Sequence, residues 1–504
     1  MDFDLVSNLL LGFQSAVTLQ NLLYCLIGVS VGTLIGVLPG MGPVATVAML
    51  LPVTYALHPA AALIMLAGIY YGAEYGGSTT AVLVNIPGEA AAVVTCIDGH
   101  QMAKRGRAGS ALGIAAIGSF VAGCFATLLI AAFAPPLTEL AFKFGPAEYF
   151  SLMVLGLVGA VVLASGSILK AICMIFIGLL LGLVGSDVNS GALRFTFGID
   201  ELMDGISFVA LSMGIYGFAE IMKNLEATIG RTLVPAEVKS VLPSREELKA
   251  SAGPIARGTL IGSFLGILPG GGALLSSFAS YTVEKKLAGA KADPPFGKGN
   301  IRGVAGPESA NNAGSQTSFI PMLTLGIPSN AVMALMIGAM MIHDITPGPQ
   351  VMTNEPALFW GLIVSMWIGN LFLIILNLPM IRVWVQLLRV PYHWLYPAIL
   401  CFCCIGVYSI SNNVFDVWLT VGFGALGYVF NKLGCECAPL ILGFILGPML
   451  EENFRRALLL SRGDLTVFLS SPISCGLLVV SALLLAVVLA PSIRSGREKA
   501  FRED

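Results

Sequence analysis

Long apolar stretches recur along almost the whole chain, and they limit its fold more than any other feature of the sequence. Clear examples are Leu19–Leu38, Gly109–Ala134, Leu358–Pro379 and Leu465–Ala490. A helix needs roughly 17–25 residues to cross the hydrocarbon core of a bilayer. Only 11% of the 504 residues are charged, whereas a soluble domain has about a quarter. We therefore predict an all-α, polytopic integral membrane protein with about 12 transmembrane helices.

Several classes of protein are disfavoured by the remaining composition. The net charge of −2 gives no reason to expect a nucleic-acid partner. The 10 Cys and 4 His are scattered, so we expect no metal site, and no P-loop or metalloprotease motif is present. We predict no catalytic residues, no enzymatic activity and no cofactor. The acidic start Met1-Asp2-Phe3-Asp4 does not resemble a cleavable signal.

The two halves of the sequence share an ordered set of motifs. Segments Gly32–Gly42 and Gly262–Gly272 match in their Gly residues and in Leu-Pro-Gly at a constant offset, and Ile86-Pro87 is echoed by Ile327-Pro328. Such duplication is typical of secondary transporters. We therefore predict two structural repeats, expected to be inverted. The predicted boundaries are an interfacial segment at 1–14, repeat 1 at 15–225, a charged linker at 226–251, repeat 2 at 252–456, and an extra C-terminal span with its tail at 457–504.

Each predicted repeat contains one polar, Gly-rich tract, near 74–88 and near 308–330. Polar backbone at membrane depth is costly unless protein or a water-filled cavity satisfies it. We interpret each tract as a re-entrant hairpin: a short helix, a Gly/Ser/Asn tip and a second short helix. Neither tract contains Lys or Arg, so helix N-termini, Asn and Ser/Thr donors and co-bound cations would have to neutralise an anionic substrate. The alternative is that these small residues only allow helices to pack closely.

This interpretation gives two sets of candidate residues. For substrate binding they are Gly76, Gly77, Ser78, Thr79, Asn85, Pro87, Gly88, Asn311, Asn312, Ser315, Thr317, Pro328 and Ser329. For the coupling ion, Na⁺ or H⁺, they are Glu74, Glu308, Gly40, Gly270 and Thr80, because acids in membrane segments are functional candidates by default. The most charged long stretch, which begins at Lys223, is interpreted as an exposed connector.

Several of these motifs resemble one family. Gly36–Pro43, Gly68–Ser78, Asn85–Glu89, Pro307–Asn312 and Leu325–Pro328 together resemble the large membrane subunit of the bacterial tripartite tricarboxylate transporters. The resemblance implies a multi-pass protein of the bacterial inner membrane that takes up citrate-like or other small carboxylates by ion symport. It also implies a periplasmic solute-binding protein and a small membrane subunit of about four spans as partners. By analogy with other paired-hairpin transporters, an elevator-like movement is expected.

Three other functions remain open on the sequence. A stand-alone ion-coupled organic-anion transporter would need no binding protein. An intramembrane enzyme would need a convergent catalytic set, which the sequence lacks. A scaffolding subunit would tolerate substitutions in both hairpins.

Overall fold

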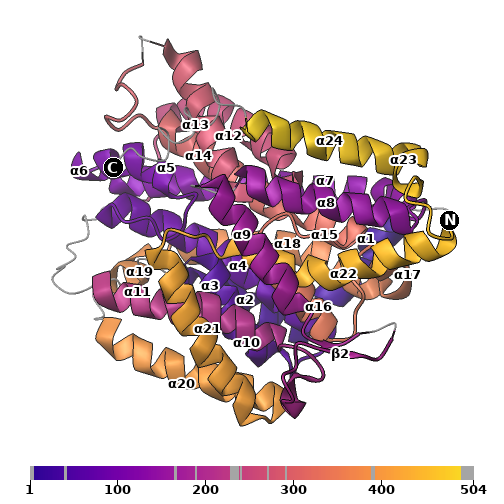
Figure 1. Cartoon of the computed structure of the whole chain (residues 1–504). Helices are drawn as coiled ribbons and strands as arrows, with labels where there is room; N and C mark the ends of the chain where they lie inside the picture. Colours follow the sequence, from indigo (N-terminus) through magenta and orange to yellow (C-terminus); the bar gives the residue numbers. More distant parts are fainter. Residues whose placement is uncertain are drawn as a thin grey trace.

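The computed structural model shows a helical protein in which only one short hairpin of strands occurs among the described residues (Figure 1). The structure describes residues 5–38, 42–163, 167–187, 190–227, 238, 241–268, 272–289, 292–387 and 392–489. The prediction of an all-α, polytopic membrane protein is confirmed.

The first half contains the helices and strands that follow in chain order. They are α1 (Leu5–Ala16), α2 (Leu19–Gly36), α3 (Pro43–Thr54), α4 (Pro59–Val84), α5 (Val93–Thr95), η1 (Cys96–His100), α6 (Gln101–Lys104), α7 (Ala108–Ala141), α8 (Pro146–Leu163), α9 (Ile168–Gly182), β1 (Gly185–Ser186), β2 (Leu193–Arg194), η2 (Asp200–Leu202), α10 (Phe208–Ser212), η3 (Met213–Phe218) and α11 (Ala219–Ala227). β1 and β2 pair antiparallel, with Gly185 opposite Arg194.

The second half is helical. Its elements are α12 (Arg245–Ile267), α13 (Gly272–Ala288), α14 (Arg302–Thr317), α15 (Phe319–Leu325), α16 (Ala331–Ile342), α17 (Pro349–Asn354), α18 (Pro356–Asn377), α19 (Ile381–Leu387), α20 (Tyr392–Ser411), α21 (Val414–Lys432), α22 (Ala438–Leu460), α23 (Val467–Ser470) and α24 (Pro472–Leu489). Four described helices, α2, α7, α18 and α21, are both long and apolar enough to cross a membrane. The predicted total of about 12 spans also counts shorter apolar helices, and it stays a prediction.

A glycine-mediated helix pair occurs in each half. Gly28, Gly32 and Gly36 of α2 face the backbone of α4, and a Cβ at Gly32 would collide with the carbonyl oxygen of Ile69. Gly258, Gly262 and Gly266 of α12 face α14 in the same way. Close backbone approach through small residues is a common way for membrane helices to associate. The two halves thus share one packing geometry, at the same four-residue spacing.

The polar tracts lie inside these pairs, and this corrects the predicted hairpin tips. α4 is continuous from Pro59 to Val84, so Gly76–Thr80 is mid-helix, and residues Asn311–Thr317 are likewise helical within α14. The tip prediction is wrong because these glycines serve close packing: a Cβ at Gly76 would lie 2.5 Å from the carbonyl oxygen of Thr33. The helices break later, at Asn85 and at Gly326, which both adopt left-handed backbone conformations and both precede Ile-Pro.

Helices of the two halves also pack against each other. α9 of the first half packs on α22 of the second, and α21 of the second half packs on η3 of the first. Glycines again form these contacts: Gly443 of α22 approaches the carbonyl oxygen of Ile175, and Gly427 of α21 approaches that of Ile215. α24 lies beside α8 (Figure 1), where Ser151 and Ser474 share a 2.7 Å hydrogen bond. The halves are therefore interlocked.

Candidate functional site

The starts of three helices meet at one cavity of about 510 Å³. Its wall includes the first residues of α3, α13 and α16, together with the chain break that follows α4. The first amides of a helix have no partner within the helix, and the helix dipole adds partial positive charge at this end. A cavity ringed by helix N-termini favours an anion.

The wall combines residues in equivalent positions of the two halves. Gly42 and Pro43 start α3, and Gly272 and Ala273 start α13 at the matching place in the repeated motif. Glu89 follows the break after α4, and Asn330 occupies the matching place before α16. The cavity thus lies between corresponding elements of the two halves. The two structural repeats themselves stay a prediction.

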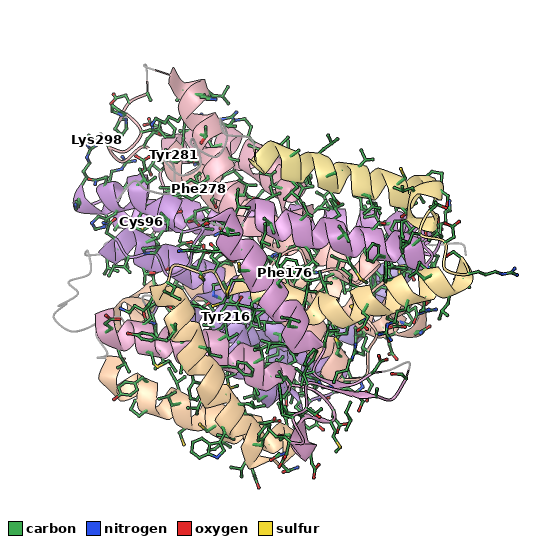
Figure 2. The ribbon with its side chains drawn as sticks, in the orientation of Figure 1. Cys96, Phe176, Tyr216, Phe278, Tyr281 and Lys298 are labelled. Atoms are coloured by element: carbon green, nitrogen blue, oxygen red, sulfur yellow. The ribbon has the colours of Figure 1, made fainter. Side chains whose placement is uncertain are left out.

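Both amide and acidic groups face this cavity. Asn330 caps α16 by accepting a 2.9 Å hydrogen bond from the Met333 amide, and its own amide group lies 3.5 Å from the Tyr70 hydroxyl. Glu74 and Glu89 also line the wall. Tyr216 of η3, labelled near the middle of Figure 2, lies there too.

One cationic side chain, Lys223, is among the described residues that line this cavity. It projects from α11, its ammonium nitrogen lies 3.7 Å from the carboxylate of Glu220, and its side chain is 58% exposed. Sequence analysis placed this residue at the start of an exposed connector because it opens a charged stretch. Its helical position one turn beyond Glu220 is what brings it to the cavity.

A buried polar cluster at the cavity wall joins the two halves. The amide group of Asn311 donates to Glu89 Oε1 at 3.1 Å, and the backbone amide of Ala91 donates to Glu89 Oε2 at 2.8 Å. Glu74 is 1% exposed, and its Oε2 atom has no hydrogen-bond partner. Of the predicted residues, Glu74 and Asn311 interact here, together with Glu89, which was not predicted.

Glu308 lies in a second cluster, within α14. Its carboxylate accepts hydrogen bonds from Ser78 at 2.6 Å and from Thr95. Both hydroxyls come from the first half of the chain, so this acid also joins the two halves. Sequence analysis singled out Glu308 and Ser78 separately, and the fold brings them together.

The other predicted residues lie at several different places. Pro87 and Gly88 line the cavity, Thr79 is buried in α4, and Asn85 caps α4 and is exposed. Several polar side chains bond within their own segments: Thr80 to Gly77, Ser315 to Asn311, Thr317 to Ala313 and Ser329 to Ser318. Asn312 donates to Ser119 at 2.7 Å. Gly76 and Gly77 pack against backbone, Pro328 belongs to the second break, and Gly40 and Gly270 lie outside the described residues.

Four cavity residues were not predicted from the sequence: Tyr70, Glu89, Asn330 and Lys223. Glu89 and Asn330 carried a usable signal, because each follows an Ile-Pro break by two residues. Tyr70 had no such signal, since it lies in a helical segment well before the break.

Comparison with known proteins agrees with this architecture. The family described as "Tripartite tricarboxylate transporter TctA family" matches residues 22–442. The chain belongs to the TctA family. It is therefore a multi-pass membrane component of a tripartite transporter. The family resemblance predicted from the sequence is confirmed.

Two relatives match large parts of the chain, and one of them covers nearly all of it. An "uncharacterized 52.8 kDa protein in TAR-I ttuC' 3'region" of Agrobacterium vitis is 56% identical over 501 residues, which cover 99% of each chain. A second Agrobacterium vitis protein, from the TAR-II ttuC' 3'region, is 60% identical over 243 residues, 48% of this chain and 100% of the relative. No solved structure matches.

Proposed function

We propose that this TctA-family chain is the substrate-translocating subunit of an ion-gradient-driven importer of tricarboxylates or related small carboxylates, supplied by a periplasmic solute-binding protein. A small membrane subunit of about four spans would complete the system in the bacterial inner membrane. The observation that carries the proposal is the cavity between the two halves, into which α3, α13 and α16 direct their N-termini.

The charge of the cavity fits a multivalent anion that enters with cations. Each helix start carries about half a positive charge, so three of them together with Lys223 can offset more than one carboxylate. Glu74, Glu89 and Glu220 on the same wall oppose this. Binding of an anion next to these acidic side chains becomes favourable when protons or metal cations neutralise part of their negative charge. The mixed wall supports ion coupling and is less suited to a simple anion pore.

The volume is appropriate for a small organic acid. A cavity of about 510 Å³ lies within the usual range of small-molecule sites. Gly42 before α3 and Gly272 at the start of α13 line the cavity and offer backbone amides as donors. Carboxylate groups would bind at these amides and at the side-chain amide of Asn330.

Uptake in proteoliposomes tests the proposal. The chain would be reconstituted with its small membrane subunit and binding protein, and uptake of labelled citrate, of a dicarboxylate and of a neutral sugar would be followed under separately imposed Na⁺ and H⁺ gradients. We expect carboxylate uptake that needs all three proteins and one of the gradients. Full activity from this chain alone would favour the stand-alone transporter.

A matched pair of variants tests the cavity itself. Ala273→Trp places a large side chain at the α13 start that lines the cavity, whereas Leu275→Trp lies on the same helix at an exposed position outside it. We expect Ala273→Trp to abolish uptake and Leu275→Trp to retain it. Equal uptake by both variants would mean that the substrate passes elsewhere.

A further inference from the structure

A second, much smaller cavity lies between α4, α7, α14 and α18. Its volume of about 10 Å³ is close to the space that one water molecule or one small ion occupies. Oxygen-bearing side chains from all four helices line it, and each is buried: Tyr75, Ser78, Thr79, Ser119, Glu308 and Asn377.

Two oxygen atoms of these lining residues lack a hydrogen-bond partner. They are the Tyr75 hydroxyl and Asn377 Oδ1, on side chains whose residues are 4% and 6% exposed. The Asn377 amide nitrogen already donates to the Leu373 carbonyl at 2.9 Å, so its oxygen remains as an acceptor. Leaving a buried polar atom unpaired costs about 1–3 kcal/mol. Two such atoms at one small cavity point to a ligand site.

Glu308 is the one acidic side chain among the described residues that line this cavity. Glu308 is 1% exposed, and its oxygen atoms accept only from the hydroxyls of Ser78 and Thr95. No Lys, Arg or His is among the described residues that line the cavity. Asn377 is the last residue of α18, and a helix C-terminus adds partial negative charge. A carboxylate buried in a membrane protein requires a proton or a cation nearby.

We propose that this cavity binds one monovalent metal cation, with Na⁺ as the best fit, through the Glu308 carboxylate, the Asn377 carbonyl and the surrounding hydroxyls. Hard oxygen donors suit hard cations. A single carboxylate balances a single positive charge, and the small volume favours an ion stripped of water.

The cation site and the large cavity share two helices. Glu308 lies one helical turn before Asn311, which donates to Glu89 at the large cavity. Ser78 and Thr79 lie in α4, whose C-terminal break lines that same cavity. If the proposed function is right, a bound cation would order α4 and α14 next to the substrate. The binding site itself does not depend on that function.

Cation binding can be measured on the purified full chain in detergent without substrate or partner subunits. The probe is ²²Na⁺, together with the midpoint of thermal unfolding, Tm, in NaCl against N-methylglucamine chloride at constant ionic strength. We expect saturable Na⁺ binding that raises Tm. Glu308→Gln should abolish both effects, and Tyr75→Phe should weaken binding about tenfold, as expected for loss of one ligand.

Tyr71→Phe is the matched control. Tyr71 lies one turn before Tyr75 in α4 and is fully buried, and its hydroxyl also has no partner, yet it does not line the small cavity. Its removal should leave Na⁺ binding unchanged. Tm without Na⁺ shows whether each variant is folded.

Three results would overturn the cation site. They are the absence of saturable Na⁺ binding in the wild-type chain, unchanged binding in folded Glu308→Gln, and equal weakening in Tyr75→Phe and Tyr71→Phe. Failure of the two proposals is distinguishable. Carboxylate uptake without Na⁺ binding removes the cation site alone, whereas Na⁺ binding without carboxylate uptake removes the proposed function alone.

Discussion

The two helix breaks that flank the large cavity have the same backbone but different side-chain chemistry. Asn85 and Gly326 both have positive φ, 58° and 72°, and each is followed by Ile-Pro. The cavity residue two positions after each Ile-Pro is Glu89 in the first half and Asn330 in the second. The shared Ile-Pro motif therefore marks where the chain bends, while individual positions determine the charge. We expect the substrate anion to lie nearer the second half and a proton or cation nearer the first.

The largest effect should come from disrupting the glycine-mediated helix packing that the two halves share. Gly32→Leu in α2 and Gly262→Leu in α12 would each drive a side chain into the backbone of the partner helix. Forced overpacking of this kind should destabilise the protein by about 3 kcal/mol or more. The fraction of monodisperse protein and Tm in detergent measure the loss.

Gly422→Leu provides the control, because nothing lies within 4 Å of a Cβ at this α21 position. It should behave like the wild-type chain. If Gly32→Leu is severe while Gly262→Leu is tolerated, the two helix pairs are not equivalent.

The next largest effect should come from making the second break as acidic as the first. Asn330→Asp can still accept the hydrogen bond from the Met333 amide, so the α16 cap should persist. A new negative charge next to a bound carboxylate costs about 1–4 kcal/mol in a partly aqueous site. We expect KM for uptake to rise at least tenfold while Tm changes little.

Asn330→Ser separates charge from size, since Ser also caps a helix and adds no charge. Its KM should lie much closer to that of the wild-type chain. An Asn330→Asp variant with normal KM would place the substrate away from the α16 start.

Sequence alone could predict much of the backbone and little of the cavity. The apolar stretches predict the helices, and the repeated Leu-Pro-Gly predicts that α3 and α13 begin at equivalent positions. The Gly76–Thr80 tract led to the wrong prediction of a hairpin tip, because glycine permits both a turn and a close helix contact. The choice between them depends on α2, which lies elsewhere in the sequence.

The positions of the charged and unpaired groups were even harder to predict from the sequence. Lys223 belongs to the most charged stretch of the chain, and composition alone assigns it to an exposed linker. Tyr75 and Asn377 are about 300 residues apart, so only the packing of α4 against α18 shows that they border one cavity. Side-chain convergence of this kind has no local signature.

A smaller effect should follow removal of the Lys223 charge, on the part of the cavity wall that the first half of the chain forms. Lys223→Gln removes a charge from a side chain that is 58% exposed, so solvent screens much of its attraction for an anion. We expect KM to rise about threefold at low salt and less at 0.5 M salt. Uptake kinetics at both salt concentrations measure this.

Lys104→Gln is the matched control, because Lys104 is exposed at the end of α6 and does not line the cavity. It should leave KM unchanged. An equal, salt-dependent rise in both variants would point to the overall surface charge, and Lys223 would then have no special place in binding.

The smallest effect concerns how the two halves start their glycine-bearing helices. α12 begins with a capping box in which Glu247 accepts from the Ser244 amide at 2.7 Å, and Arg107 donates to the same carboxylate at 2.7 Å. Partial burial acts to raise the pKa of Glu247, but the hydrogen bonds outweigh it and hold the pKa at about 2. α2 begins at the neutral cap Thr18, which accepts from the Asn21 amide at 3.3 Å.

These caps should respond differently to acid. The pKa of Glu247 is lower in the folded protein than the ordinary value of about 4.3, so its stabilisation is present above that pH and is lost as pH falls toward 2. Glu247→Gln should therefore lower Tm at pH 7, by the equivalent of about 1 kcal/mol, and should match the wild-type chain more closely at pH 3. Thr18→Ala should lower Tm by a similar or smaller amount at both pH values, because a hydroxyl cap does not titrate. A wild-type-to-Gln difference that stays constant from pH 7 to pH 3 would show that the α12 cap acts through hydrogen-bond geometry alone.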